Sequence, residues 1–169
     1  MSPRDGTALR RIHLDEASVQ ADEQGKPVVN ATELYGTPGT IDVGDFNFDG
    51  REDFAVLSGM SGPYGGPTFT VLLASPSGEI VRSPELSALT EETLGLFPVD
   101  AKKRRLITLS KSGCCHHVME ELDVVNDKPV PMVRETEDAT GDALVITREQ
   151  RVGGMWRKST QRRRSPGRE

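Results

Sequence analysis

Short segments in which apolar and polar residues alternate run through most of this 169-residue sequence. Alternation with a period of two places the apolar side chains on one face of a β-strand. The segments are separated by turns that draw on 17 Gly and 11 Pro, the residues that most strongly interrupt regular structure. The pattern therefore predicts a mostly β protein rather than a helical bundle.

The positions of these segments predict how the strands are connected. We expect strands over residues 9–15, 28–34, 53–58, 68–74, 96–100, 105–111, 117–125, 129–137 and 143–152. Compact polar turns join the later strands, which is typical of an antiparallel meander. We therefore expect a sandwich-like antiparallel β-meander that forms a single domain over 9–160, with flexible ends at 1–8 and 161–169.

One segment departs from the alternation and predicts a short helix near residues 84–94. Ser83 is a favourable N-cap, and Pro84 follows at the first helical position. Leu86 and Leu89 then lie three residues apart, which places them on one helical face.

The charge distribution separates an acidic body from a basic tail. The net charge is −5, but the last nine residues, QRRRSPGRE, carry four Arg and one Glu, which leaves the rest at −8. The body offers no basic face studded with aromatic residues, so we expect no nucleic-acid binding. No apolar run approaches the roughly 20 residues that cross a bilayer, and the start of the chain lacks the apolar stretch of a signal peptide. We expect either a cytosolic protein or a mature form without its leader.

The stretch GDFNFDGREDFAVLSG, residues 44–59, predicts a calcium-binding loop that leads into a strand. The expected ligands are the side chains of Asp45, Asn47, Asp49 and Asp53 and the main-chain carbonyl of Arg51, spaced as in an EF-hand loop. Gly50 stands where such a loop turns sharply. The twelfth position is Val56 instead of the usual Glu, and a strand pattern follows instead of a helix.

The expected role of the ion is structural. Without a cation, three Asp side chains this close would repel one another. Because Ca²⁺ prefers six to eight oxygen ligands, water or a distant acid must complete its shell. The alternative interpretation is a metal-free surface turn rich in Asp and Asn.

Immediately downstream lies a loop that contains four Gly and two Pro around one aromatic residue, Tyr64. A Tyr at the tip of such a loop can anchor a partner, because it offers a large amphipathic surface and loses little rotamer entropy. The alternative is a long hairpin loop whose Tyr folds back onto the sheet. The residue types leave both interpretations open.

Cys114 and Cys115 are adjacent and are the only cysteines in the chain. Adjacent Cα atoms are about 3.8 Å apart, which is short of the usual disulfide range. A vicinal disulfide would therefore be strained, and two buried thiols are the alternative. A zinc site formed with His116 and His117 is not expected, since four consecutive residues cannot surround a tetrahedral ion.

The segment DFNFDGREDFAVLSGMSGPYGGPTFTVLL, followed by SKSGCCHH, resembles a family of bacterial periplasmic immunity proteins. These guard against peptidoglycan-hydrolase toxins delivered by type IV secretion systems. In fold they are similar to the periplasmic inhibitors of invertebrate-type lysozyme. The resemblance covers most of residues 9–160.

The resemblance implies a β-rich domain that plugs the active site of a lysozyme-like hydrolase with a protruding loop. The implied target-binding residues are Ser61, Gly62, Tyr64, Gly65 and Gly66. The family signature Ser-Gly-x-x-Tyr is one residue longer than the match here, which leaves open whether Ser58 or Ser61 takes the part of the serine. The resemblance also implies a periplasmic location, with a cleaved signal or lipoprotein leader upstream.

The expected function is thus inhibition rather than catalysis. A hydrolase is less favoured, because the acidic side chains are committed to a cation and no nucleophile motif such as G-x-S-x-G is present. The alternative from another class is a calcium-stabilised extracytoplasmic module that binds glycan or mediates adhesion.

Overall fold

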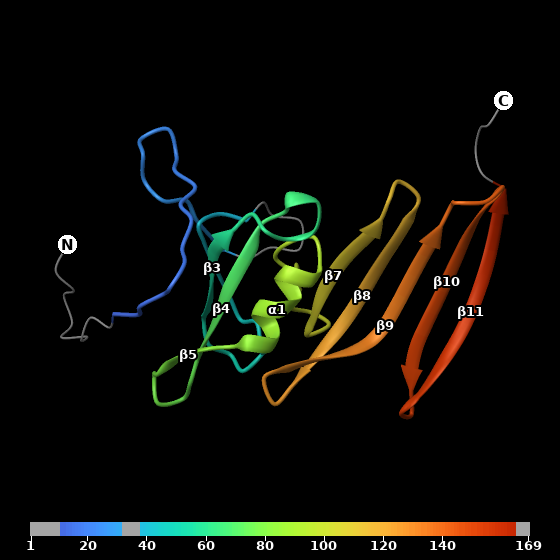
Figure 1. Ribbon diagram of the computed structural model, residues 1–169. Coiled ribbons are helices and arrows are strands. Elements are labelled where there is room, and N and C mark those ends of the chain that lie inside the picture. The colour runs from blue at the N-terminus through green and yellow to red at the C-terminus, as the bar shows by residue number, and fades with distance from the viewer. Residues whose placement is uncertain (1–10, 32–37, 165–169) are drawn as a thin grey trace.

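Two β-sheets and one α-helix make up the computed structural model, which describes residues 11–31 and 38–164 (Figure 1). The first sheet contains, in spatial order, β1 (Val29–Ala31), β2 (Ile41–Gly44), β3 (Asp53–Gly59), β4 (Thr68–Ala74) and β5 (Ile80–Arg82). β1 and β2 are parallel, and the other neighbours are antiparallel. A short 3-10 turn, Pro63–Gly65, lies between β3 and β4.

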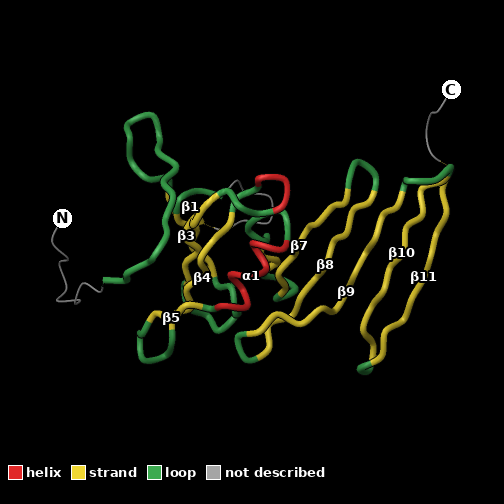
Figure 2. The backbone as a smooth tube through the Cα atoms, viewed as in Figure 1, coloured by secondary structure: helices red, strands yellow, loops and turns green. Residues whose placement is uncertain are grey.

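The second sheet is the predicted meander, because each strand pairs with the next one along the chain in antiparallel orientation (Figure 2). Its strands are β6 (Val99–Asp100), β7 (Arg105–Ser112), β8 (His116–Val125), β9 (Lys128–Asp138), β10 (Ala143–Val152) and β11 (Met155–Arg164). The mostly β architecture predicted from the alternating segments is confirmed.

The predicted helix is also confirmed as α1 (Pro84–Glu92), with the Ser83 side chain accepting a hydrogen bond from the backbone N–H of Leu86. α1 covers backbone groups of β4 beyond the short β5. The N–H of Val71 donates to Ser87 Oγ at 2.9 Å, and the N–H of Phe69 donates to Thr90 Oγ1 at 2.8 Å. Side-chain hydroxyl groups of α1 therefore accept the hydrogen bonds of β4 N–H groups that a longer β5 would otherwise have accepted.

One hydrophobic core joins both sheets, and this is why the chain forms a single domain. Its fully buried residues include Phe46 and Phe69 from the first half of the chain and Leu106 and Leu122 from the second sheet. Phe97, which precedes β6, packs edge-on against Phe46 with ring centroids 5.7 Å apart.

Three sequence-based expectations were wrong at the level of single strands. Residues 11–15 form no strand, whereas 41–44 form β2, which is too short for its alternation to stand out. Residues 161–164, expected in a flexible end, continue β11 to Arg164. The remaining expected end residues, 1–8 and 165–169, lie outside the described residues. No helix in the described ranges is long and apolar enough to cross a membrane.

Candidate functional site

The acidic loop between β2 and β3 is closed by hydrogen bonds from its own backbone to its own side chains. Asp45 accepts hydrogen bonds from the N–H groups of Asp49 and Gly50, at 3.0 and 2.9 Å. The Asn47 side-chain oxygen accepts a second one from Asp49 at 3.1 Å, and Asp49 accepts one from Arg51 at 2.9 Å. Gly50 has a φ of +87°, so it makes the sharp left-handed turn that was predicted at this position.

Asp53 ties this loop to the first sheet. Its side chain is completely buried, and its two oxygens accept hydrogen bonds from the N–H groups of Phe46 at 2.8 Å and Ala74 at 2.9 Å. Burial raises the pKa of Asp53 above its ordinary value, and the two amide hydrogen bonds oppose that rise. The carboxylate thus links the loop, the start of β3 and the end of β4.

Two residues from turns of the second sheet hold the other side of the acidic loop. Asp127, in the β8–β9 turn, accepts a hydrogen bond from the Asn47 amide group at 2.9 Å. Arg104, in the β6–β7 turn, donates to the carbonyl of Phe48, and its guanidinium lies 5.7 Å from the centroid of the Phe48 ring. The loop therefore connects the two sheets, a role that no local sequence pattern indicates.

The oxygen atoms of this loop are of the kind that bind a hard cation. Carboxylate, amide and carbonyl oxygens are the ligands that Ca²⁺ prefers, and each oxygen that accepts one hydrogen bond keeps a second lone pair. In this structure Asp49 is instead paired with the Arg51 guanidinium, at 2.8 Å. Within residues 11–31 and 38–164, no group of three or more His, Cys, Asp or Glu side chains is arranged around a common metal position. An ion at this loop would therefore compete with Arg51 for the carboxylate of Asp49.

The glycine-rich loop lies at the other end of β3. Its turn is closed by backbone hydrogen bonds from Gly65 to Gly62 at 3.0 Å and from Gly66 to Pro63 at 3.1 Å. A side chain would not be accommodated easily: a Cβ at Gly62 would lie 3.1 Å from the Gly66 carbonyl oxygen, and Gly65 has φ at +72°. The glycines thus make a small, closed turn that projects Tyr64, which itself adopts a left-handed φ of +59°.

The two serines that the sequence left as alternatives are placed differently. Ser58 Oγ lies 3.0 Å from Thr68 Oγ1, so that hydroxyl is engaged at the base of the loop. Ser61 is exposed beside the turn. Ser61 is therefore the serine that is accessible next to Tyr64.

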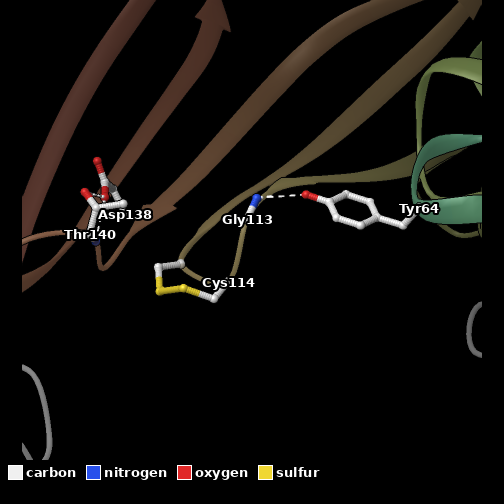
Figure 3. The surroundings of a disulfide bond; sticks show 6 residues. Tyr64, Gly113, Cys114, Asp138 and Thr140 are labelled. Atoms are coloured by element: carbon white, nitrogen blue, oxygen red, sulfur yellow. Dashed lines mark hydrogen bonds between the residues drawn. A yellow bond between two sulfur atoms is a disulfide. The ribbon is translucent and has the colours of Figure 1, made fainter.

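Tyr64 connects the glycine-rich loop to the β7–β8 turn of the second sheet (Figure 3). The backbone N–H of Gly113 donates to the Tyr64 hydroxyl at 2.8 Å, and Lys111 Nζ lies 4.4 Å from the ring centroid. The side chain of Tyr64 is nevertheless 63% exposed. It therefore neither projects freely nor folds flat onto the sheet, but is an exposed ring with a fixed hydroxyl.

The β7–β8 turn also contains the paired cysteines. A disulfide bond joins Cys114 and Cys115, which decides between the two alternatives left open by the sequence, and Cys114 is exposed. The carbonyl of Cys115 accepts a hydrogen bond from the N–H of Ala139 at 2.8 Å, so the turn is fixed to the β9–β10 connection as well. Two motifs that are far apart in the sequence, the glycine-rich loop and the cysteine pair, form one surface.

The two candidate sites are separated. Asp53 begins β3 and Gly59 ends it, so the acidic loop and the glycine-rich loop lie at opposite ends of this strand. The six steps from the first to the last residue of β3, at about 3.3 Å each, place the two loops roughly 20 Å apart. A cation in the acidic loop would thus be remote from Tyr64.

Among solved structures, the chain is similar to a type IV secretion system related protein from Xanthomonas, with a TM-score of 0.67 and 31% sequence identity. The match covers 78% of this chain and 65% of that protein, so the chain spans just under two thirds of the length of its relative. No protein-family model matches the sequence, and neither does any curated protein.

Proposed function

We propose that this chain is an immunity or inhibitor protein that blocks a lysozyme-like peptidoglycan hydrolase by inserting the glycine-rich Tyr64 loop into its active site. The observation that carries this proposal is the state of Tyr64, whose ring is 63% exposed while its hydroxyl is held by the N–H of Gly113. An aromatic side chain that is ordered before binding loses little freedom when it enters a partner.

The chemistry of the loop suits a site built from carboxyl groups. Lysozyme-like cleavage requires a pair of carboxyl groups beside the scissile bond. Ser61 and Tyr64 offer hydroxyl groups that can hydrogen-bond to such groups, and the ring of Tyr64 can occupy a sugar subsite. Lys111, 4.4 Å from the Tyr64 ring centroid, adds a positive charge beside the loop that complements an acidic cleft.

The similarity to a secretion-system related protein from Xanthomonas supports a link between this chain and type IV secretion. Within that setting we propose that the chain guards against an exported wall hydrolase. Peptidoglycan lies in the periplasm, which we propose as the location of the mature protein. The Cys114–Cys115 disulfide supports this location, since disulfides persist in oxidising compartments.

We assign a structural Ca²⁺ to the acidic loop, in keeping with its oxygen donors. The side chains of Asp45, Asn47, Asp49 and Asp53 and the carbonyl of Arg51 would hold it. Asp127 already contacts Asn47, so it is the acid from outside the loop that is best placed to complete the shell. The ion would fix the joint between the sheets and would take no part in contacts with the target.

Two alanine variants of exposed residues in the same loop test the role of Tyr64. Tyr64→Ala should weaken inhibition of the target hydrolase at least tenfold, whereas Met60→Ala, which removes a side chain that is 59% exposed, should leave inhibition within about twofold. Thermal melts of both variants should show that the fold is retained. If Tyr64→Ala inhibits as well as the unmodified protein, the loop is not the inhibitory element.

A further inference from the structure

The β10–β11 hairpin, residues 143–164, has a charge opposite to that of the rest of the molecule. It contains seven Arg or Lys residues and one Glu, a formal charge of +6. Since the whole chain carries −5, the remainder carries −11. The hairpin extends away from the helix and the core, and β11 is the last strand of its sheet (Figure 1).

Most of the positive charges on this hairpin are unpaired. Arg148 forms an ion pair with Glu135 at 3.0 Å. The other six cations make no ion pair or side-chain hydrogen bond with any residue that the structure describes: Arg151, Arg157, Lys158, Arg162, Arg163 and Arg164. All ten residues of β11 are exposed, and of its cations only Lys158 has an acidic residue, Glu149, directly opposite it on β10, so most of these charges repel one another without compensation.

The backbone of β11 is open along its outer edge. The Gly153–Gly154 turn has φ values of +58° and +82°, as a type I′ turn requires, and it joins the paired residues Val152 and Met155. Because hydrogen-bonded and non-hydrogen-bonded pairs alternate from that turn, the even-numbered residues 156–164 direct their backbone N–H and C=O groups outward. No strand in the described part of the chain pairs with this edge.

We infer that the outer edge of β11 is a docking site for an extended acidic segment of another protein, which adds to the sheet as a further antiparallel or parallel strand. Such a segment satisfies both features at once: its backbone completes the row of hydrogen bonds, and its carboxylates neutralise the unpaired cations. A lipid surface or a nucleic acid would use the charges but not the open backbone.

A second copy of this chain fits the edge poorly in the register that is centred on the middle of the exposed charges. Antiparallel pairing of two β11 strands about Thr160 would place Lys158 opposite Arg162 and Arg157 opposite Arg163, and like charges directly opposite each other are destabilising. β11 itself contains no acidic residue that could neutralise these cations, so an acidic segment of a different polypeptide is the better occupant. This interface is separate from the Tyr64 loop and does not depend on the proposed inhibition.

Binding of a synthetic peptide tests the inference without knowledge of the natural partner. The probe is a blocked nonapeptide in which five Glu alternate with Val and Thr, and the control peptide has Lys in place of each Glu. The fluorescence of Trp156, the single Trp of the chain and half-exposed on β11, reports binding to the full-length protein. Hydrogen exchange then shows which amides become protected.

We expect the acidic peptide to bind and the basic control to be inert, with slower exchange at the outward amides of residues 158, 160 and 162. Thr160→Pro removes one outward N–H without removing a β10–β11 hydrogen bond, so it should weaken binding about tenfold or more. Thr160→Ala keeps that N–H and should bind like the unmodified protein.

Several results would overturn the inference. One is a failure of the acidic peptide to bind, in which case the cations only guard the edge against self-association. Another is equal affinity of Thr160→Pro and Thr160→Ala for the peptide, because charge alone would then explain binding. Exchange protection in the unmodified protein decides the matter if Thr160→Pro does not fold: binding without protection of the outward amides excludes strand addition.

Discussion

The backbone N–H of Gly113 donates a hydrogen bond of 2.8 Å to the hydroxyl of Tyr64, which lies 49 residues earlier in the chain. This contact joins the two sheets on the surface where the glycine-rich loop projects. It also means that the orientation of Tyr64 depends on the β7–β8 turn, whose shape is constrained by the Cys114–Cys115 disulfide.

Replacing Tyr64 with Phe should uncouple the loop from that turn. The ring and its contact with Lys111 remain, but the acceptor of the Gly113 N–H is lost. We expect the Gly113 amide to exchange several-fold faster with solvent in Tyr64→Phe, because an exposed amide without a partner is open to water. An unchanged exchange rate at Gly113 would show that the hydrogen bond does not persist in solution.

Phe97→Ala should cause a large loss of stability. Phe97 is 1% exposed and packs against the Phe46 ring in the core that joins the sheets. Removing a buried Phe side chain costs about 3–5 kcal/mol in the free energy of unfolding. Val81→Ala, at a position that is 49% exposed, is the control and should change stability by about 0.5 kcal/mol or less in a urea titration.

Asp53→Asn tests whether both carboxylate oxygens are needed as acceptors. The amide group of Asn would place N–H donors against the backbone N–H of Phe46 or of Ala74. Leaving one of these buried donors unpaired should cost about 1–3 kcal/mol of unfolding free energy, measured without added metal. Asp15→Asn, at an exposed position, should be neutral. Equal stability of both variants would contradict the role given to Asp53.

Stability should fall at acidic pH in part through Glu121. Burial raises the pKa of this carboxyl, but its hydrogen bond to Arg105, at 2.6 Å, and the nearby charges of Lys103 and Arg105 outweigh burial, so the pKa lies below its ordinary 4.5. A depressed pKa means that the unfolded chain takes up the proton first, so this contribution is present above pH 4.5 and is lost as the pH falls below it.

The variant Glu121→Gln isolates this effect. The variant should lose stability relative to the unmodified protein at pH 7, and the difference should shrink as the pH is lowered from 5 towards 3. Urea titrations across that range measure it. A difference that stays constant with pH would mean that the charge of Glu121 does not contribute.

Calcium should raise the melting temperature, and chelation should lower it, because a ligand that binds only the folded state stabilises it. Asp45→Asn removes a charge from the loop and should abolish most of this response. Asp22→Asn, at an exposed position far from the loop in the sequence, should keep the full response. Identical melts with Ca²⁺ and with chelator would leave the loop as a metal-free turn.

The sheets and the helix could be predicted largely from the sequence, because their signals are local. Alternation marked the strands of the meander, and Ser83 followed by Pro84 marked the start of α1. β11 was missed entirely, both within the expected domain and beyond its end, since its residues are nearly all polar. It forms because Gly153 and Gly154 reverse the chain and pair it with β10.

The candidate sites could be predicted only in part. The residues of the acidic loop and of the glycine-rich loop stood out by type and spacing. Their partners did not: Asp127 lies 80 residues from Asn47, and Gly113 contributes only a backbone N–H. Contacts of this kind depend on how the two sheets meet, which no local pattern encodes.

Inhibition of a hydrolase is the central property proposed for this protein, so the decisive measurement is a peptidoglycan-clearing assay titrated with the full chain in the presence of Ca²⁺. The panel would contain lysozyme-fold hydrolases, including an effector of a type IV secretion system. We expect clearing by at least one of them to fall linearly to zero at one equivalent of this protein. Undiminished clearing by every hydrolase, with the protein instead retained on peptidoglycan itself, would contradict it.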